Sequence, residues 1–225
     1  MIWQRLRRIP WATFLLLLIQ ILVFIWETLN GGSLNSNTLI RAGAKLDVLL
    51  VQGQWWRLVS PIFVHIGWEH LLINSLTLYF LGMGLEPLYG SGRFLVIYLL
   101  SGVGGNLCSF ALGNLQSVSA GASTSLFGLF GLYVALGVIF RNNPAVRQWS
   151  RQFLVLIVLN LVFDLFLGQI DIWGHIGGAI FGFLLGTVVA KQQFLDAIPT
   201  RWRIINTIVL VIIAVALYQI GVRRI

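Results

Sequence analysis

The segment Ile172–Ala190, IWGHIGGAIFGFLLGTVVA, carries no formally charged residue and is long enough to cross a bilayer as one helix. Four of its glycines recur at every fourth position and so share one helix face: Gly174, Gly178, Gly182 and Gly186. Small residues at this spacing let a neighbouring helix approach closely in lipid. The segment therefore predicts a tightly packed transmembrane helix with a histidine, His175, next to the glycine face.

The composition of the whole chain indicates an integral membrane protein. Of its 225 residues, 58% are apolar before the 24 glycines are counted, and only 10% are charged. Soluble domains are about 45–50% apolar with glycine included and about 25% charged. This chain therefore has too little polar surface to cover a water-soluble globule. Its single cysteine, Cys108, excludes an internal disulfide.

Seven apolar stretches predict an all-α, polytopic membrane protein with seven transmembrane helices. Besides Ile172–Ala190 they are Trp11–Leu29, His70–Tyr89, Phe94–Leu112, Val118–Phe140, Phe153–Gly168 and Ile204–Val222. The long first connection, Asn30–Glu69, is rich in tryptophan and apolar residues. We expect it to form a partly helical element at the membrane interface.

The distribution of basic residues predicts how the chain is oriented. With the N-terminus inside, ten of the fifteen Lys and Arg residues lie inside, as the positive-inside rule favours. A net charge of +8 in a soluble protein would suggest nucleic acid. Here the basic residues flank apolar segments, so we expect membrane lipids as partners and no nucleic acid. The apolar run after Arg5, Arg7 and Arg8 is expected to be a retained signal anchor.

Polar side chains from three of these helices are expected at one depth, just below the outer face. His70 and Asn74 open one helix, one turn apart. Ser123 and His175 would lie about 27 and 24 Å above the inner boundary, at 1.5 Å per residue. Polar groups inside a bilayer are costly, which makes these residues functional candidates. Close packing of their helices would bring the Ser123 hydroxyl within hydrogen-bond reach of His175.

A serine and a histidine at one depth suit nucleophilic catalysis. Histidine takes the hydroxyl proton near neutral pH and returns it to the leaving amine. His70 and Asn74, with backbone amides near Ser123, would stabilise an oxyanion. Phe127, one turn after Ser123, is placed to hold the imidazole by ring packing.

The remaining polar residues of the predicted helices suggest no third catalytic group. No carboxylate stands at a suitable place to orient His175, so the sequence predicts a Ser–His dyad. Asn160 and Asp164, in the fifth predicted helix, are expected to line an internal water pocket or to form a polar gate.

Each of these residues also has a structural interpretation. A lone transmembrane serine usually bonds to a helix backbone, and glycine ladders mostly serve packing. The three histidines, His65, His70 and His175, would suggest zinc, but the step from His65 to His70 fits no pair of ligands on one helix. We therefore expect neither a metal nor another cofactor.

Motifs in a characteristic order resemble the rhomboid family of intramembrane serine proteases. They are the segment Gly53–Gly82 with its Trp-Arg pair and His-x-x-x-Asn, GASTSLFG at Gly121–Gly128, and GHIGGAIFG at Gly174–Gly182. The segment Gly84–Gly102 is also similar. The resemblance covers residues 40–190. It implies a six-helix core within residues 1–203 and an additional C-terminal transmembrane helix in residues 204–225.

The resemblance also implies an activity and a site. The family cuts transmembrane segments of other proteins, here near the outer face. Ser123 matches the nucleophile, His175 the general base, and His70 and Asn74 the oxyanion-stabilising positions. Supporting positions match His65, Phe127, Gly121 and Gly178. Thr124 departs from the pattern, because the family usually has glycine after the nucleophile, and activity would suffer if the substrate backbone needed that space.

Two functional classes remain open at this point. One is a serine endopeptidase acting on transmembrane protein substrates. The other is a non-catalytic rhomboid-like protein that binds transmembrane clients, although such relatives usually lack the serine or the histidine, and both are present here. The expected location is a bacterial inner or plasma membrane. The sequence predicts neither the substrate nor the oligomeric state.

Overall fold

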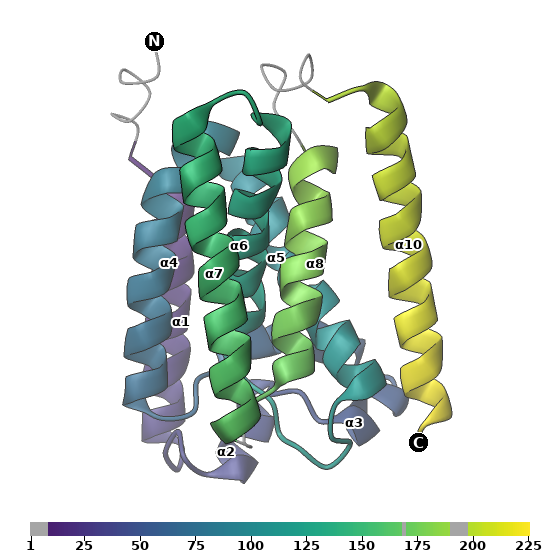
Figure 1. Ribbon diagram of the computed structural model, residues 1–225. Helices are drawn as coiled ribbons and strands as arrows, with labels where there is room; N and C mark the ends of the chain where they lie inside the picture. The colour runs from purple at the N-terminus through teal and green to yellow at the C-terminus, as the bar shows by residue number, and fades with distance from the viewer. Residues whose placement is uncertain (1–8, 168–169, 190–197) are drawn as a thin grey trace.

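The computed structural model describes residues 9–167, 170–189 and 198–225, and in this part of the chain seven long helices form a bundle (Figure 1). Five are long and apolar enough to cross a membrane: α1 (Trp11–Leu29), α4 (Trp68–Tyr89), α5 (Ser91–Leu112), α7 (Pro144–Leu167) and α10 (Thr200–Arg223). Two are apolar but shorter: α6 (Ser123–Ile139) and α8 (Ile172–Val188). The predicted all-α, multi-pass membrane architecture is confirmed.

Helix α6 begins later than the sequence predicts, because residues 118–122 are not helical. The backbone of Ser119 pairs with that of Lys45, and the N–H of Gly121 donates to the carbonyl of Pro61. Gly121 also has a φ of +134°, which only glycine adopts readily. Partners outside the helix therefore hold this segment open, and the prediction of a helix from Val118 is wrong by five residues.

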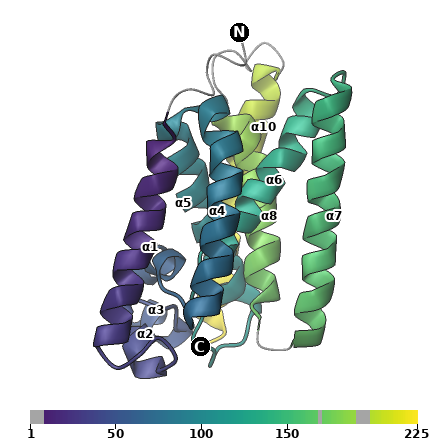
Figure 2. The same cartoon turned by 90° about the vertical axis from the view of Figure 1, so that its left-hand side faces the viewer.

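The connection between α1 and α4, residues 30–67, folds at one end of the bundle beside α1 (Figure 2). It contains α2 (Ser36–Ala42), α3 (Asp47–Val51) and two 3-10 turns, η2 (Trp55–Leu58) and η3 (Ser60–Phe63). The buried guanidinium of Arg57 donates to the carbonyls of Ile40 and Ala44. Lys45 and Asp47 form a fully buried ion pair at 2.5 Å. The connection is thus partly helical, as predicted, and internally bonded.

The glycine face of α8 packs directly on α6. A Cβ added at Gly178 would overlap the carbonyl of Thr124, and one at Gly182 would overlap the carbonyl of Gly128. Gly186 faces side chains of α6, and Gly174 faces the side chains of Thr124 on α6 and of Asp171. The predicted close approach of these two helices is confirmed, and their backbones touch because no side chain lies between them.

Helices α7 and α10 lie at the periphery of the bundle. In the most apolar 18-residue stretch of each helix, only 11% of the residues of α7 and 6% of those of α10 are buried, against 67% in α5. Helix α10 packs on α5 and α8, while α7 packs mainly on α6. The contact of α7 centres on Phe153, whose ring stacks on Tyr133 at 4.0 Å between centroids. The exposed apolar side chains on both helices suit contact with lipid.

Candidate active site

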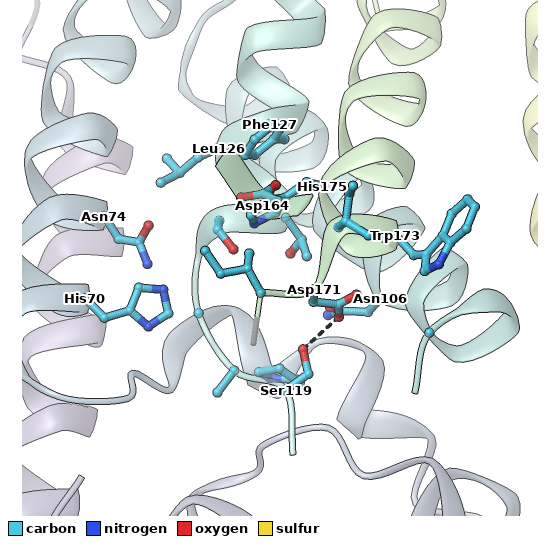
Figure 3. A pocket seen from close by; sticks show the side chains of 18 of the residues that line it. His70, Asn74, Asn106, Ser119, Leu126, Phe127, Asp164, Asp171, Trp173 and His175 are labelled. Carbon is cyan, nitrogen blue, oxygen red and sulfur yellow. Dashed lines mark hydrogen bonds and ion pairs between the residues drawn. The ribbon is translucent and has the colours of Figure 1, made fainter. Parts of the chain in front are cut away.

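A cavity of about 1080 Å³ opens beside the α1–α4 connection, among α4, α5, α6, α7, α8 and residues 118–122 (Figure 3). Six of the eight predicted site residues line it: His70, Asn74, Gly121, Ser123, Phe127 and His175. The other two support it from outside. His65 lies against His70, with ring centroids 5.4 Å apart, and Gly178 belongs to the α6–α8 contact. Residues far apart in the sequence therefore share one cavity.

Ser123 is the first residue of α6, at the point where the open segment turns into a helix. The first N–H groups of a helix have no acceptor within it, and a helix N-terminus carries partial positive charge. Unpaired backbone donors are therefore available close to the Ser123 hydroxyl. This start inside the bundle is a consequence of the non-helical residues 118–122.

The opposite wall is formed by His70 and Asn74 of α4, whose side chains extend toward the cavity (Figure 3). A Cβ added at Gly121 would lie 2.5 Å from Cε1 of His70, so the ring packs against a backbone that only glycine provides. The side-chain nitrogen of Asn74 is buried and has no hydrogen-bond partner among the described residues. A buried donor of this kind is free for a group that enters the cavity.

Two contacts hold the imidazole of His175. The Phe127 ring stacks on it with centroids 4.0 Å apart and planes 10° from parallel, as the sequence predicts. Nδ1 of His175 lies 2.7 Å from Oδ2 of Asp164 on α7. The prediction that no carboxylate orients His175 is therefore wrong. The two residues are eleven positions apart, and only the antiparallel packing of α7 and α8 brings them together.

The side chains of Ser123 and His175 line the same cavity without a direct hydrogen bond between them in the described part of the chain. The expected bond is thus not formed in this structure. Hydrogen bonds between nucleophile and base are often long in ligand-free sites and tighten in the substrate complex.

Asp171, which sequence reasoning did not single out, joins three walls of the cavity. Its carboxylate accepts the N–H of Gly174 at 3.0 Å and thereby caps α8. It also accepts a hydrogen bond from the hydroxyl of Ser109 on α5. A further one comes from the hydroxyl of Ser119 in the open segment (Figure 3). Aspartate immediately before an apolar helix is a common N-cap, so this signal was present in the sequence.

His65 supports the cavity from the α1–α4 connection. Its ring is fully buried, and Nδ1 lies 3.3 Å from the carbonyl of Phe63. Burial, with a smaller contribution from neighbouring His70, lowers the pKa of His65 to about 3. The ring is therefore neutral at physiological pH and packs behind His70 as an uncharged group.

The geometry gives no support to a zinc site built from the three histidines. Among the described residues, no group of three or more His, Cys, Asp or Glu side chains is arranged to hold a metal ion. Nδ1 of His175 is engaged by Asp164, and the rings of His65 and His70 meet edge to face.

The chain also resembles known proteins over most of its length. Residues 52–192 match the family model of the Rhomboid domain. The chain belongs to the rhomboid family. It is 40% identical to the rhomboid protease GluP of Bacillus subtilis (strain 168) over 214 residues, which cover 94% of this chain and 41% of GluP. The rhomboid-family protein YdcA of the same organism is 32% identical over 188 residues, which cover 84% of this chain and 92% of YdcA. Rhomboid-like protease 1 of Toxoplasma gondii is 34% identical over 161 residues, which cover 70% of this chain and 55% of that protein.

Family membership makes the departure at Thr124 more informative. In this rhomboid, Thr124 is helical and buried, and its side chain packs toward Gly105 of α5 and Gly174 of α8. Both neighbours lack a Cβ, so the extra atoms of threonine occupy space between helices. The Thr124 amide keeps its place in the first turn of α6.

Proposed function

We propose that this rhomboid is an intramembrane serine endopeptidase in which Ser123 is the nucleophile and His175 the general base. The observation that carries the proposal is the convergence of Ser123, His175 and Asn74 from three helices on one cavity. Relatives named as rhomboid proteases support the reaction class. The substrates are transmembrane segments of other membrane proteins, cut near the outer face of the cell membrane.

The proposed reaction is acyl transfer to serine followed by hydrolysis. Oγ of Ser123 attacks the carbonyl carbon of the scissile peptide while Nε2 of His175 takes the hydroxyl proton. The tetrahedral intermediate collapses, the C–N bond breaks, and His175 gives its proton to the leaving amine. Water then attacks the acyl-enzyme with His175 again as base, which releases the carboxylate product and restores Ser123.

The developing negative charge needs donors that are already in place. The unpaired side-chain nitrogen of Asn74 is one, and the free N–H groups at the start of α6 are others. His70 adds a ring nitrogen on the same wall. Removing one donor of an oxyanion hole costs about 10²–10³ in kcat in serine proteases.

A substrate helix reaches such a site only after local unwinding. All its amides are hydrogen-bonded within the helix, so no carbonyl is open to attack in the intact segment. Glycine and proline lower helix stability by about 1 and 3 kcal/mol relative to alanine. We therefore expect substrates with small or helix-breaking residues near the cleavage site.

Covalent labelling with a fluorophosphonate probe tests the nucleophile directly in the detergent-solubilised full chain. We expect the wild type to be labelled, Ser123→Ala to be unlabelled and His175→Ala to be labelled far more slowly. Ser125→Ala is the matched control, because Ser125 lies on the same helix, is fully buried and does not line the cavity. It should be labelled like the wild type.

Each other outcome has a definite meaning. Labelling of Ser123→Ala at the wild-type rate would exclude Ser123 as the nucleophile. If a folded wild-type preparation neither reacts with the probe nor cleaves a single-span model substrate with a Gly/Ala-rich segment in proteoliposomes, the serine-protease proposal fails. A non-catalytic, client-binding rhomboid would then be the better description.

A further inference from the structure

The orientation of the His175 ring depends on two contacts, and neither involves Ser123. Stacking on Phe127 fixes the plane of the imidazole. The contact of Nδ1 with Asp164, at 2.7 Å, fixes the rotation within that plane. Nε2 is therefore the ring nitrogen that remains for a proton from Ser123.

Asp164 differs from the residues around it on α7. Its neighbours Phe163, Leu165 and Phe166 are 63%, 69% and 82% exposed on the apolar surface of the bundle, whereas Asp164 is 7% exposed. A carboxylate buried in a membrane helix is costly unless it is paired. Among the described residues, the hydrogen bond to His175 is the only one that the Asp164 side chain makes. Asp164 also lines the cavity, and the ring nitrogen of His175 is the protein group in this part of the chain that pairs with its carboxylate.

We propose that Asp164 is a positioning residue for the general base, an inference that rests on the proposed function. Its carboxylate accepts the Nδ1–H of His175 and so selects the tautomer whose Nε2 carries the free lone pair. When His175 takes the Ser123 proton, the imidazolium is paired with a negative charge on its far side. Asp164 acts through His175 alone, and the transferred proton stays on the imidazole.

The placement of Asp164 on α7 gives this arrangement a consequence. Ser123 and His175 are carried by α6 and α8, whose backbones are in contact. Asp164 is carried by α7, and the half of α7 that contains Asp164 is mostly exposed. The base is therefore fully oriented only while α7 is docked on the bundle.

The test compares Asp164→Asn and Asp164→Glu in the full chain, with the single-span model substrate in proteoliposomes. Asparagine keeps the volume but no longer selects the tautomer. We expect kcat to fall at least 100-fold, toward the ~10⁴-fold loss seen when the orienting carboxylate of a serine protease becomes an amide. KM should change less than twofold, and the rate of fluorophosphonate labelling should fall in parallel with kcat. The kcat of Asp164→Glu should be at least tenfold higher than that of Asp164→Asn.

Asn206→Ala is the matched control for loss of a polar contact on α8. Asn206 of α10 donates to Thr187 at the far end of α8, so its removal tests packing without touching the cavity. Both kcat and KM should stay at wild-type values. The inference is overturned if Asp164→Asn keeps wild-type kcat, if it changes KM alone, or if Asp164→Glu and Asp164→Asn are equally impaired. If the wild type itself is neither labelled nor active, the proposed function fails and takes this inference with it.

Discussion

Helices α7 and α8 both pack on α6, but they do so in opposite ways. Between α8 and α6 the backbones touch, because Gly178 and Gly182 leave no side chain in the interface. Between α7 and α6 the contact is made largely by aromatic side chains around Phe153. One turn earlier on α7, Ser150 packs on Gly137 and its hydroxyl donates to the carbonyl of Val134. The centre of the α8 contact is backbone on backbone, whereas the α7 contact is made mostly by side chains, which can move.

This difference divides the proposed catalytic groups between a fixed wall, formed by α6 and α8, and an adjustable one, formed by α7. Ser123 and His175 belong to the fixed pair of helices, so their separation is set by the glycine contact. Asp164 belongs to α7 and reaches His175 through a single hydrogen bond. The proposed nucleophile and base are thus placed by the rigid part of the fold, and the orientation of the proposed base depends on the looser part.

The strongest test of the fixed wall is Gly182→Ala. The added Cβ overlaps the carbonyl and Cα of Gly128, and a backbone carbonyl cannot rotate away as a side chain can. Overpacking typically costs 1–3 kcal/mol, and we expect about 3 kcal/mol of unfolding free energy here. Reversible denaturation in mixed micelles, followed by tryptophan fluorescence, measures the loss.

Gly92→Ala is the control for this substitution. Gly92 also lies in a helix, but a Cβ added there meets no atom within 4 Å. Alanine is the better helix former by roughly 0.5–1 kcal/mol, so this variant should be equal to or more stable than the wild type. Equal effects of the two substitutions would show that the α6–α8 contact is not the rigid element.

The adjustable wall is tested by Phe153→Ala. The substitution removes two ring contacts, with Tyr133 and Phe130, and leaves Ser150 as the other close contact of α7 with α6 described above. Hydrophobic exclusion from water contributes little inside a bilayer, so we expect a loss of about 1–2 kcal/mol, below the 3–5 kcal/mol typical of soluble cores. In nanodiscs, amide hydrogen exchange should accelerate in α7 and stay unchanged in α8.

Phe163→Ala removes the same side chain from the exposed face of the same helix and should alter neither quantity. Faster exchange in α8 as well as α7 after Phe153→Ala would mean that the two helices move together. The division into a fixed and an adjustable wall would then be wrong.

The sequence predicts the fixed wall well and the adjustable wall poorly. Apolar length located the seven helices, and the glycine spacing identified the face of α8 that meets α6, because both signals are periodic within one segment. The start of α6 was misplaced because residues 118–122 are apolar enough to continue a helix. Residues 118–122 are kept out of the helix by backbone hydrogen bonds to residues elsewhere in the chain, Lys45 and Pro61.

The candidate site shows the same limit. His70, Asn74, Ser123 and His175 were found because each is polar within an apolar helix at a common depth. The pairing of Asp164 with His175 was missed, because it depends on how α7 rotates about its own axis and meets α8 across a turn. Neither quantity is encoded in a spacing along the chain.

The effect that is smallest at neutral pH concerns a third wall, the α1–α4 connection behind His70. The pKa of His65 is lowered to about 3, mainly by burial, so the native state keeps this ring neutral while the unfolded chain protonates it near 6.5. The unfolded state then binds more protons at every pH between these values, and stability falls as the pH drops below 6.5, by at most about 1.4 kcal/mol per pH unit from this group.

His65→Gln removes the titration while keeping a neutral polar side chain of similar length. Thermal unfolding from pH 7.5 to 5 should show near-equal wild-type and variant stability at the upper end and a smaller decline in the variant toward the lower end. Burial raises the pKa of Asp47 in the same connection, but Asp47 is present in both proteins and cancels in the difference. Parallel declines in the two proteins would mean that water reaches His65, and that this wall belongs with α7 rather than with the glycine-packed pair.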